Sequence, residues 1–259
     1  MLKNMRFQIQ QVVKTTALIV AAGLMVQSLP SWAGFNPRNR EARRPGNRRP
    51  GGTRSDCKTD TTPPLTPLVP ASNWGLTISP YPTFHWYMPT GNNHPRAEFA
   101  LYKVTNADKI ETEGFVREEE EVYSTQFQIN QQSGIASLTL PSESTLSPLD
   151  VGQAYYWQVK LLCPDETGED YVVSQYVEGW VTRVNPSAGL AEKLAQAQPV
   201  ARIDLFAEDG LWNDALTQLT TLQRIHPEDQ QLKQEWTALF NSEYVNLSEI
   251  PPKLIAQPE

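Results

Sequence analysis

Residues 149–163 have the sequence LDVGQAYYWQVKLLC, and they decide the class of fold that we expect. The side chains on one face of this stretch, taken two residues apart, are Tyr155, Trp157, Val159, Leu161 and Cys163. A period of two residues is typical of a β-strand, whose successive side chains point to opposite faces. The stretch therefore predicts a strand with one buried face and with Cys163 directed into the core.

Other short β-type runs lie on both sides of this strand, and turn residues separate them. Residues 83–88 (TFHWYM) and 123–129 (YSTQFQI) alternate as half-buried strands do. Further runs cover 98–104, 134–140 and 171–184, and a proline-broken edge covers 65–69 with 74–78. Seven or so strands with hairpin-length links indicate two packed antiparallel sheets.

The spacing Leu149-x-x-Gly152-x-x-Tyr155-x-Trp157 resembles the tyrosine corner of fibronectin type III and immunoglobulin-like domains. In those domains the tyrosine hydroxyl bonds back to the upstream backbone. The resemblance implies a mainly β fold, an immunoglobulin/fibronectin-III-like antiparallel β-sandwich, which we place at residues 57–185. A small α-helical unit is expected to follow it.

The start of the chain has the order of segments that is typical of a secretory signal. Lys3, Arg6 and Lys14 are followed by the uncharged stretch 15–26 and by the small residues around Ala33. The uncharged stretch is shorter than the roughly 20 residues of a membrane-spanning helix. We therefore predict a signal peptide at residues 1–33 and an exported product, periplasmic or extracellular, that is not an integral membrane protein.

The two cysteines, Cys57 and Cys163, are expected to form one disulfide in an oxidising compartment. A reactive or metal-binding thiol pair is the alternative, and neither a CxxC spacing nor a neighbouring histidine supports it. Because Cys57 precedes the first expected strand, the bond would tie the incoming segment to the sandwich rather than join its two sheets.

Residues 34–56 are rich in arginine, proline and glycine. Their arginines are Arg38, Arg40, Arg43, Arg44, Arg48, Arg49 and Arg54. We expect a disordered tether, because so few apolar side chains cannot offset the loss of chain entropy. The arginines could contact an anionic polymer, but a solvated spacer that folds back weakly on the acidic remainder of the chain is favoured. Nucleic acid is not an expected partner, since no aromatic residues are interleaved for base stacking.

After Pro186 the apolar period becomes helical, and residues 186–245 are predicted to form a helical tail. The sequence Gly210-x-Trp212-x-Asp214-Ala215-Leu216 resembles one tetratricopeptide repeat, although Arg202 and Ile203 depart from that pattern. A binding solenoid needs about three repeats, so we expect these helices to pack on the sandwich or on each other. Residues 246–259 are predicted to be flexible.

Candidates for catalysis are few. The histidines His85, His94 and His226 lie in a strand, a turn and a helix end, and no HExxH or nucleophile-elbow motif accompanies them. Two acidic groups could hold calcium: Glu118 to Glu121, and Asp165, Glu166, Glu169 and Asp170. We favour a solvated strand and a hairpin loop instead, because EF-hand spacing is lacking. No cofactor, metal or catalytic residue is therefore expected.

Five segments occur in a recognisable succession: LTPLVP (65–70), NWGLT (73–77), YPTFHWY (81–87), EGWVTRV (178–184) and GLWNDAL (210–216). They resemble a secreted cyanobacterial family of unknown function, the one numbered 928, from about Cys57 to Leu239. The resemblance implies an exported cyanobacterial protein and provides no activity to transfer. We expect a non-catalytic binding or structural module that engages an envelope protein or a glycan. The alternative is a polysaccharide-acting or metal-dependent hydrolase that uses the acidic loops.

Overall fold

The computed structural model describes residues 34–39, 44, 48–52, 62–89, 96–107, 117–129, 132–143 and 146–255. These residues all belong to one contact unit, Trp32–Glu259. The predictions for the signal peptide, for Cys57 and its disulfide, for His94 and for Arg40, Arg43 and Arg54 fall outside the described residues.

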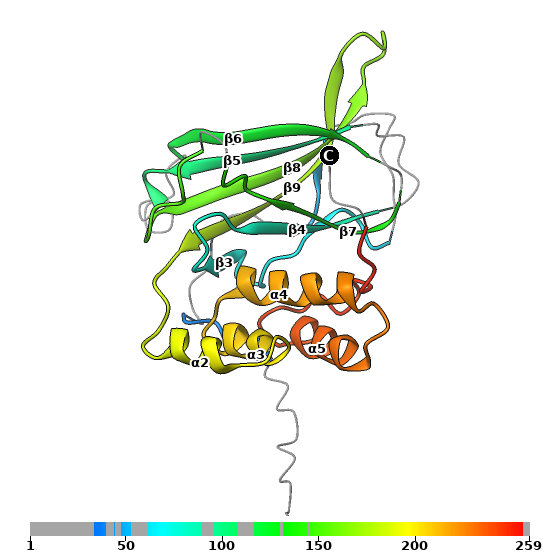
Figure 1. The fold of residues 1–259 in the computed structure, drawn as a ribbon. Coiled ribbons are helices and arrows are strands. Elements are labelled where there is room, and N and C mark those ends of the chain that lie inside the picture. The colour runs from blue at the N-terminus through cyan, green and yellow to red at the C-terminus, as the bar shows by residue number, and fades with distance from the viewer. Residues whose placement is uncertain are drawn as a thin grey trace, which may run out of the picture. The chain divides into compact units, whose positions relative to one another are not determined.

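Two sheets form the β part of the structure (Figure 1). Along the larger sheet lie β1 (Gly51–Gly52), β9 (Tyr171–Arg183), β8 (Ala154–Pro164), β5 (Arg96–Val104) and β6 (Glu119–Gln128), in that order. The smaller sheet has the order β2 (Thr66–Pro67), β4 (Thr83–Met88) and β7 (Gly134–Thr139). The prediction of a mainly β fold with two antiparallel sheets is confirmed.

One strand departs from the antiparallel expectation. β3 (Trp74–Thr77) pairs in parallel with β9, from Trp180 to Arg183. β1 pairs in antiparallel with Gln175 and Tyr176 of the same strand, so β1 and β3 occupy successive stretches of one edge of β9. The sequence of residues 74–77 predicts a strand but does not determine the direction of its neighbour.

The space between the sheets is filled by large apolar side chains. Phe84 of β4 lies 5.0 Å from Phe99 of β5 and 5.4 Å from Trp157 of β8, measured between ring centroids. All three side chains are buried in one core cluster. The alternation in the sequence placed Trp157 on the buried face, because a strand sends every second side chain to the same side.

The helices form a second core against the smaller sheet. They are α2 (Leu190–Gln196), α3 (Ala201–Glu208), α4 (Trp212–Ile225) and α5 (Gln230–Phe240). The apolar stripes of α3, α4 and α5 meet Leu68, Tyr87 and Ile135 in one buried cluster. β4 is therefore buried along its whole length and not half-buried as predicted, because the sandwich core covers one face and the helical core lies on the other.

The described residues of 34–56 differ from the predicted disordered tether. Phe35 is 3% exposed, lies in the helical core, and makes an edge-to-face contact with Trp212 at 5.3 Å. The backbone N–H of Asn36 donates to the carbonyl of Ala207, and β1 pairs with β9. A segment of low apolar content is ordered here because one aromatic side chain and a few backbone hydrogen bonds attach it to a surface that the rest of the chain supplies.

Residues 246–255 likewise differ from the predicted flexible C-terminus. Leu247, Ile250 and Ile255 are buried, and Leu254 forms a parallel bridge with Ile135 of β7. The N–H of Ile135 donates to the carbonyl of Lys253 at 2.7 Å, and the N–H of Ile255 donates to the carbonyl of Ile135 at 3.0 Å. These residues thus continue the smaller sheet beyond β7. The sequence did not predict this pairing, because residues 246–255 have no regular apolar pattern.

In the described part of the chain, no helix has the length and apolar character needed to cross a membrane.

Candidate functional site

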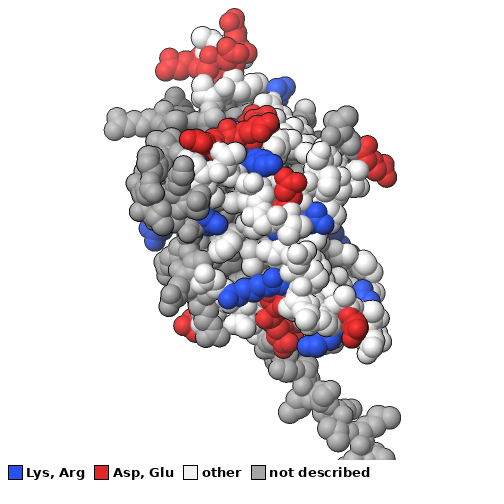
Figure 2. Space-filling model, turned by 90° about the vertical axis from the view of Figure 1, so that its left-hand side faces the viewer, with Lys and Arg blue, Asp and Glu red and all other residues white. Residues whose placement is uncertain are grey.

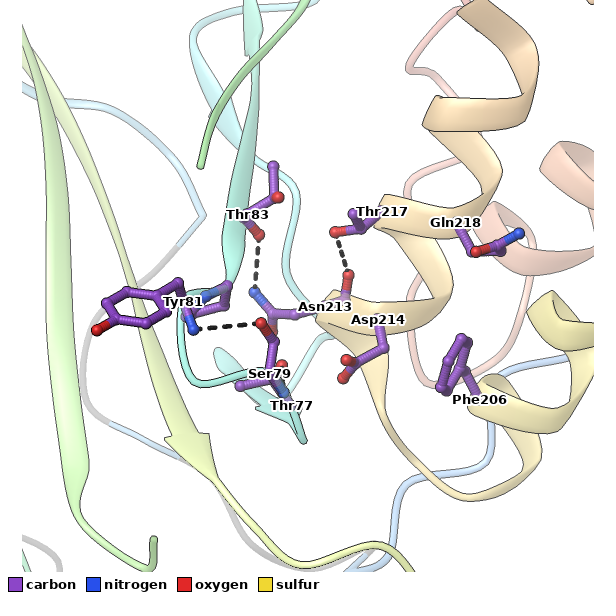
Figure 3. Close-up of a pocket in the computed structure, with 10 residues that line it drawn as sticks. Thr77, Ser79, Tyr81, Thr83, Phe206, Asn213, Asp214, Thr217 and Gln218 are labelled. Atoms are coloured by element: carbon purple, nitrogen blue, oxygen red, sulfur yellow. Dashed lines mark hydrogen bonds between the residues drawn. The ribbon is translucent and has the colours of Figure 1, made fainter. Parts of the chain in front are cut away.

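A hollow of about 270 Å³ lies where the β3–β4 connection meets helices α3 and α4 (Figure 3). Its lining residues are Thr77, Ser79, Tyr81, Pro82, Thr83, Phe206, Asn213, Asp214, Thr217 and Gln218. The sandwich supplies the first five of these residues, and the helices supply the others. The pocket therefore exists only because the helical unit packs on the sandwich.

The start of α4 places the polar side chains of the helical wall. Gly210 has a φ of +72°, a conformation that favours glycine and ends α3 sharply, so that α4 begins at Trp212. Asn213 and Thr217 are four residues apart, as are Asp214 and Gln218, and such pairs share one helix face. The Thr217 hydroxyl donates to the Asn213 carbonyl at 2.6 Å.

Asp214 is the acid of the pocket. Its Oδ2 accepts the backbone N–H of Ile78 at 3.1 Å, which joins α4 to the β3–β4 connection. Burial raises the pKa of this carboxyl from 3.8 to about 6, although hydrogen bonds from Ile78, Thr77 and Ser79 act in the opposite direction. The Asp214 carboxyl therefore gains or loses its negative charge in mildly acidic solution. It lies in the first turn of α4, where the helix dipole is positive.

Asn213 is held in a close contact with β3. Its Nδ2 donates to the Thr83 carbonyl at 3.3 Å, while its Oδ1 is buried and has no hydrogen-bond partner among the described residues. A Cβ at Gly75 would lie 2.2 Å from that oxygen. Glycine at position 75 is thus what allows the helix to approach the sheet edge this closely.

The β3–β4 connection is a fixed wall, because its own side chains cap its backbone. The Thr77 hydroxyl accepts the N–H of Ser79 at 3.0 Å, and the Ser79 hydroxyl accepts the N–H of Tyr81 at 3.2 Å. The Tyr81 hydroxyl donates to the Leu146 carbonyl at 3.2 Å. Both sides of the pocket are therefore preorganised.

The chemistry of the lining suits binding. Six of its residues are partly exposed: Ser79, Tyr81, Phe206, Asp214, Thr217 and Gln218. They provide hydroxyls, an amide, a carboxyl and two aromatic rings, while histidine, lysine and cysteine do not occur among the ten lining residues. Such a wall can donate to and accept from a polar ligand.

The tyrosine-corner residues lie in the sandwich and do not line the pocket. The backbone N–H of Asp150 donates to the Tyr155 hydroxyl at 3.0 Å, so this hydroxyl contacts the backbone five residues upstream, as an acceptor. Leu149 and Trp157 are buried in the sandwich core, and Gly152 has a φ of +82°. Their role as a structural signature stays a prediction.

Arg38, Arg44 and Arg48 of the N-terminal segment contact the protein itself. Arg38 pairs with Asp209 at 2.7 Å and donates to the Asn185 carbonyl. Arg44 lies over the Trp74 ring at 4.6 Å, and Arg48 donates to the Val245 carbonyl. Burial lowers the pKa of Arg48, and Arg49 is exposed. Contact with an anionic polymer stays a prediction for this segment.

The histidines and acidic groups have ordinary surroundings where they are described. His85 is buried and shares a hydrogen bond with the Thr220 hydroxyl at 3.1 Å; burial, with a smaller effect of Arg224, lowers its pKa to about 3. His226 ends α4. Burial and nearby charge therefore keep His85 neutral in ordinary solution.

The second acidic group surrounds the β8–β9 turn, where Asp165 accepts the N–H and the hydroxyl of Thr167. Figure 2 shows acidic side chains gathered at this end of the molecule. Glu119 to Glu121 lie on β6, directly after Glu118. The described residues hold no group of three or more Asp, Glu, His and Cys side chains placed to bind a metal ion.

The comparisons with known proteins give a family and no relative of known activity. No curated protein and no solved structure matches the chain. One family model does match, over residues 49–255, and this region contains β1 to β9, α2 to α5 and the whole pocket. The chain therefore belongs to the family described as Domain of Unknown Function, DUF928.

Proposed function

We propose that this protein is an exported, non-catalytic binding module of the cell envelope or extracellular space, and that its pocket receives a sugar unit of a glycan. The observation that carries the proposal is the preorganised wall of carboxyl, hydroxyl and amide groups around Asp214, with the Phe206 ring beside it (Figure 3). Export rests on the leader-like residues 1–33.

A sugar fits the chemistry of this wall. Each sugar hydroxyl both donates and accepts, so it can bind the Asp214 carboxylate as a donor and the Gln218 amide as an acceptor. The Ser79 hydroxyl can donate, and the Thr217 hydroxyl, whose proton goes to the Asn213 carbonyl, can accept. The Phe206 ring supplies an apolar surface of the kind on which the C–H face of a sugar can pack. A preformed hollow that combines polar groups with two aromatic rings favours such a ligand over a purely apolar one.

The finer points of architecture are also part of this proposal. We infer that the sandwich is an immunoglobulin-like variant, supported by the Asp150–Tyr155 hydrogen bond, and that Cys163 is paired with Cys57. We further infer that α3 and α4 are the remnant of one tetratricopeptide-like unit from a cyanobacterial ancestor. These inferences affect the framework of the pocket and not its chemistry.

The hydrolase alternative has less support. A glycosidase uses two carboxyl groups on opposite sides of the bond that it cleaves, whereas the pocket lining contains one. In the acidic loop, Asp165 is occupied by its own turn. Binding without turnover is the function that these groups favour.

The test is a titration of the purified, ¹⁵N-labelled protein with a panel of neutral mono- and disaccharides, followed by NMR. We expect shifts confined to the amides of residues 77–83, 206 and 213–218. Asp214→Asn and Phe206→Ala should each weaken binding by roughly tenfold, the value of one charge-assisted hydrogen bond or one packed ring.

Asp165→Asn, in the β8–β9 turn, is the matched control and should bind as the native protein does. Shifts that map to another surface, or an Asp214→Asn variant with unchanged affinity, would refute the sugar site.

A further inference from the structure

Glu235 of α5 is a buried acid without a cationic partner. Its exposed fraction is 2%, and its Oε1 has no hydrogen-bond partner among the described residues. Its carboxyl is hydrogen-bonded to two side chains, Gln231 of its own helix and Asp204 of α3. The carboxyl of a half-buried residue of α3 thus meets the buried carboxyl of Glu235 on α5.

The basic side chains of α3, α4 and α5 are engaged elsewhere, and Lys193 of α2 is exposed to solvent. Arg202 of α3 donates to the Ala197 carbonyl, Arg224 of α4 donates to the Ile255 carbonyl, and Lys233 of α5 pairs with Glu228 at 2.9 Å. Arg38, from the N-terminal segment, pairs with Asp209. α4 presents Ala215, Leu216 and Leu219 to this core. The charges that act on Glu235 therefore come from Asp204.

Two carboxylates within hydrogen-bond distance in a buried place repel each other, and a proton between them removes the repulsion. We propose that Asp204 and Glu235 share one proton and form a pH-sensitive clasp between α3 and α5, closed in acid and loosened in neutral to basic solution. Such a clasp bears on the pocket wall, because Phe206 follows Asp204 by two residues on α3.

The sign of the effect follows from the titration. Burial, and after it the negative charge of Asp204, raise the pKa of Glu235 from 4.5 to about 7. Between these values the folded protein holds a proton that the unfolded chain has released, so stability falls as pH rises through this window. The stabilisation by the clasp is complete below about pH 4.5 and lost above about pH 7.

The experiment compares urea unfolding of the native protein, Glu235→Gln and Glu208→Gln at pH 5 and pH 8. Glu208 is an exposed acid at the end of α3 and serves as the control. From pH 5 to pH 8 we expect the unfolding equilibrium constant of the native protein and of Glu208→Gln to rise at least about tenfold more than that of Glu235→Gln. Equal changes in all three proteins would overturn the proposal.

A second measurement uses the native protein alone, in case a variant fails to fold. Carbon-detected NMR of the Glu235 carboxyl should give a titration midpoint between pH 6 and pH 8, and a midpoint near 4.5 would overturn the shared proton. Hydrogen exchange, corrected for intrinsic rates, should show that the amides of α3 and α5 lose protection relative to β8 as pH rises. Equal loss in all three elements would overturn the clasp.

Discussion

Among single residues, Trp212 makes the most direct connection between the helices and the sandwich. It is fully buried, its Nε1 donates to the Leu68 carbonyl at 2.7 Å, and its ring meets Phe35 and Phe240 at 5.3 and 6.1 Å. One side chain thereby joins the N-terminal segment, the loop after β2 and two helices. The sequence marked Trp212 only as part of a repeat-like pattern.

Two replacements of Trp212 separate the contribution of its hydrogen bond from the contribution of its buried ring. Trp212→Phe keeps a ring but leaves the Leu68 carbonyl unpaired, and we expect a loss of about 1–3 kcal/mol in the free energy of unfolding. Trp212→Ala also opens a cavity and should cost about 3–5 kcal/mol. Urea denaturation measures both values. Ile225→Ala, at a residue that is 62% exposed, should stay within about 0.5 kcal/mol of the native protein. If Trp212→Phe had the same free energy of unfolding as that control, the hydrogen bond from Trp212 to Leu68 would make no measurable contribution to stability.

Asp214 should make the pocket sensitive to pH. Because its pKa is raised from 3.8 to about 6, the carboxyl is largely protonated at pH 5 and largely ionised at pH 7. Only the ionised form accepts through all its lone pairs, so we expect a bound saccharide to gain affinity from pH 5 to pH 7. Calorimetry at the two values measures the gain. Asp214→Asn should lose this dependence, and a native protein with equal affinity at both values would contradict the prediction.

At the scale of elements, the agreement with the sequence depends on whether an element is defined by its own periodicity. β4, β5, β7, β8 and β9 fall within a few residues of their predicted bounds, and α2 to α5 lie inside the predicted helical residues 186–245, because two-residue and 3.6-residue patterns report which face is buried. β1 is a pair of glycines with no such pattern. The parallel partner of β3 and the order of residues 246–255 depend on surfaces that distant parts of the chain provide.

The pocket was missed for the same reason. Asn213 and Asp214 were visible as polar residues at the start of a helix, but their neighbours Thr77 and Thr83 are more than a hundred residues away in the sequence. Nothing local indicates that Gly75 allows the close approach of Asn213. Sequence periodicity could therefore predict the strands and helices that form each wall of the pocket, but not that these walls lie next to each other in the folded protein.

The N-terminal segment is expected to contribute to stability as an element. Phe35→Ala removes a buried ring from the helical core and should lower the free energy of unfolding by about 3–5 kcal/mol, as measured by urea denaturation. Glu192→Gln changes an exposed residue of α2 and should cost less than about 0.5 kcal/mol. If Phe35→Ala were as stable as Glu192→Gln, the N-terminal segment would be a tether after all.

For the whole molecule, the decisive feature is that two cores share the smaller sheet. Phe84, Trp86 and Met88 of β4 enter the sandwich core, while Tyr87 enters the helical core and His85 bonds to Thr220 of α4. A strand with both faces buried cannot lose one core without exposing apolar surface on that side. The sandwich and the helices should therefore unfold together.

Removing residues 251–259 tests this cooperativity. The deletion takes Leu254 and Ile255 from the edge of β7, and we expect a loss of at least about 2–4 kcal/mol with a single transition that far-ultraviolet dichroism and tryptophan fluorescence report alike. Lys253→Ala, at an exposed residue of the same segment, should leave the midpoint unchanged. Two separate transitions in the shortened protein would show that the cores are independent.

The position of Leu254 and Ile255 also has a consequence for biosynthesis. These residues follow every described strand and helix in the chain, yet they complete the sheet on which the helices pack. A nascent chain consequently lacks part of both cores until residues 254 and 255 have left the ribosome, so folding of the sheet and the helices during translation stays incomplete up to that point.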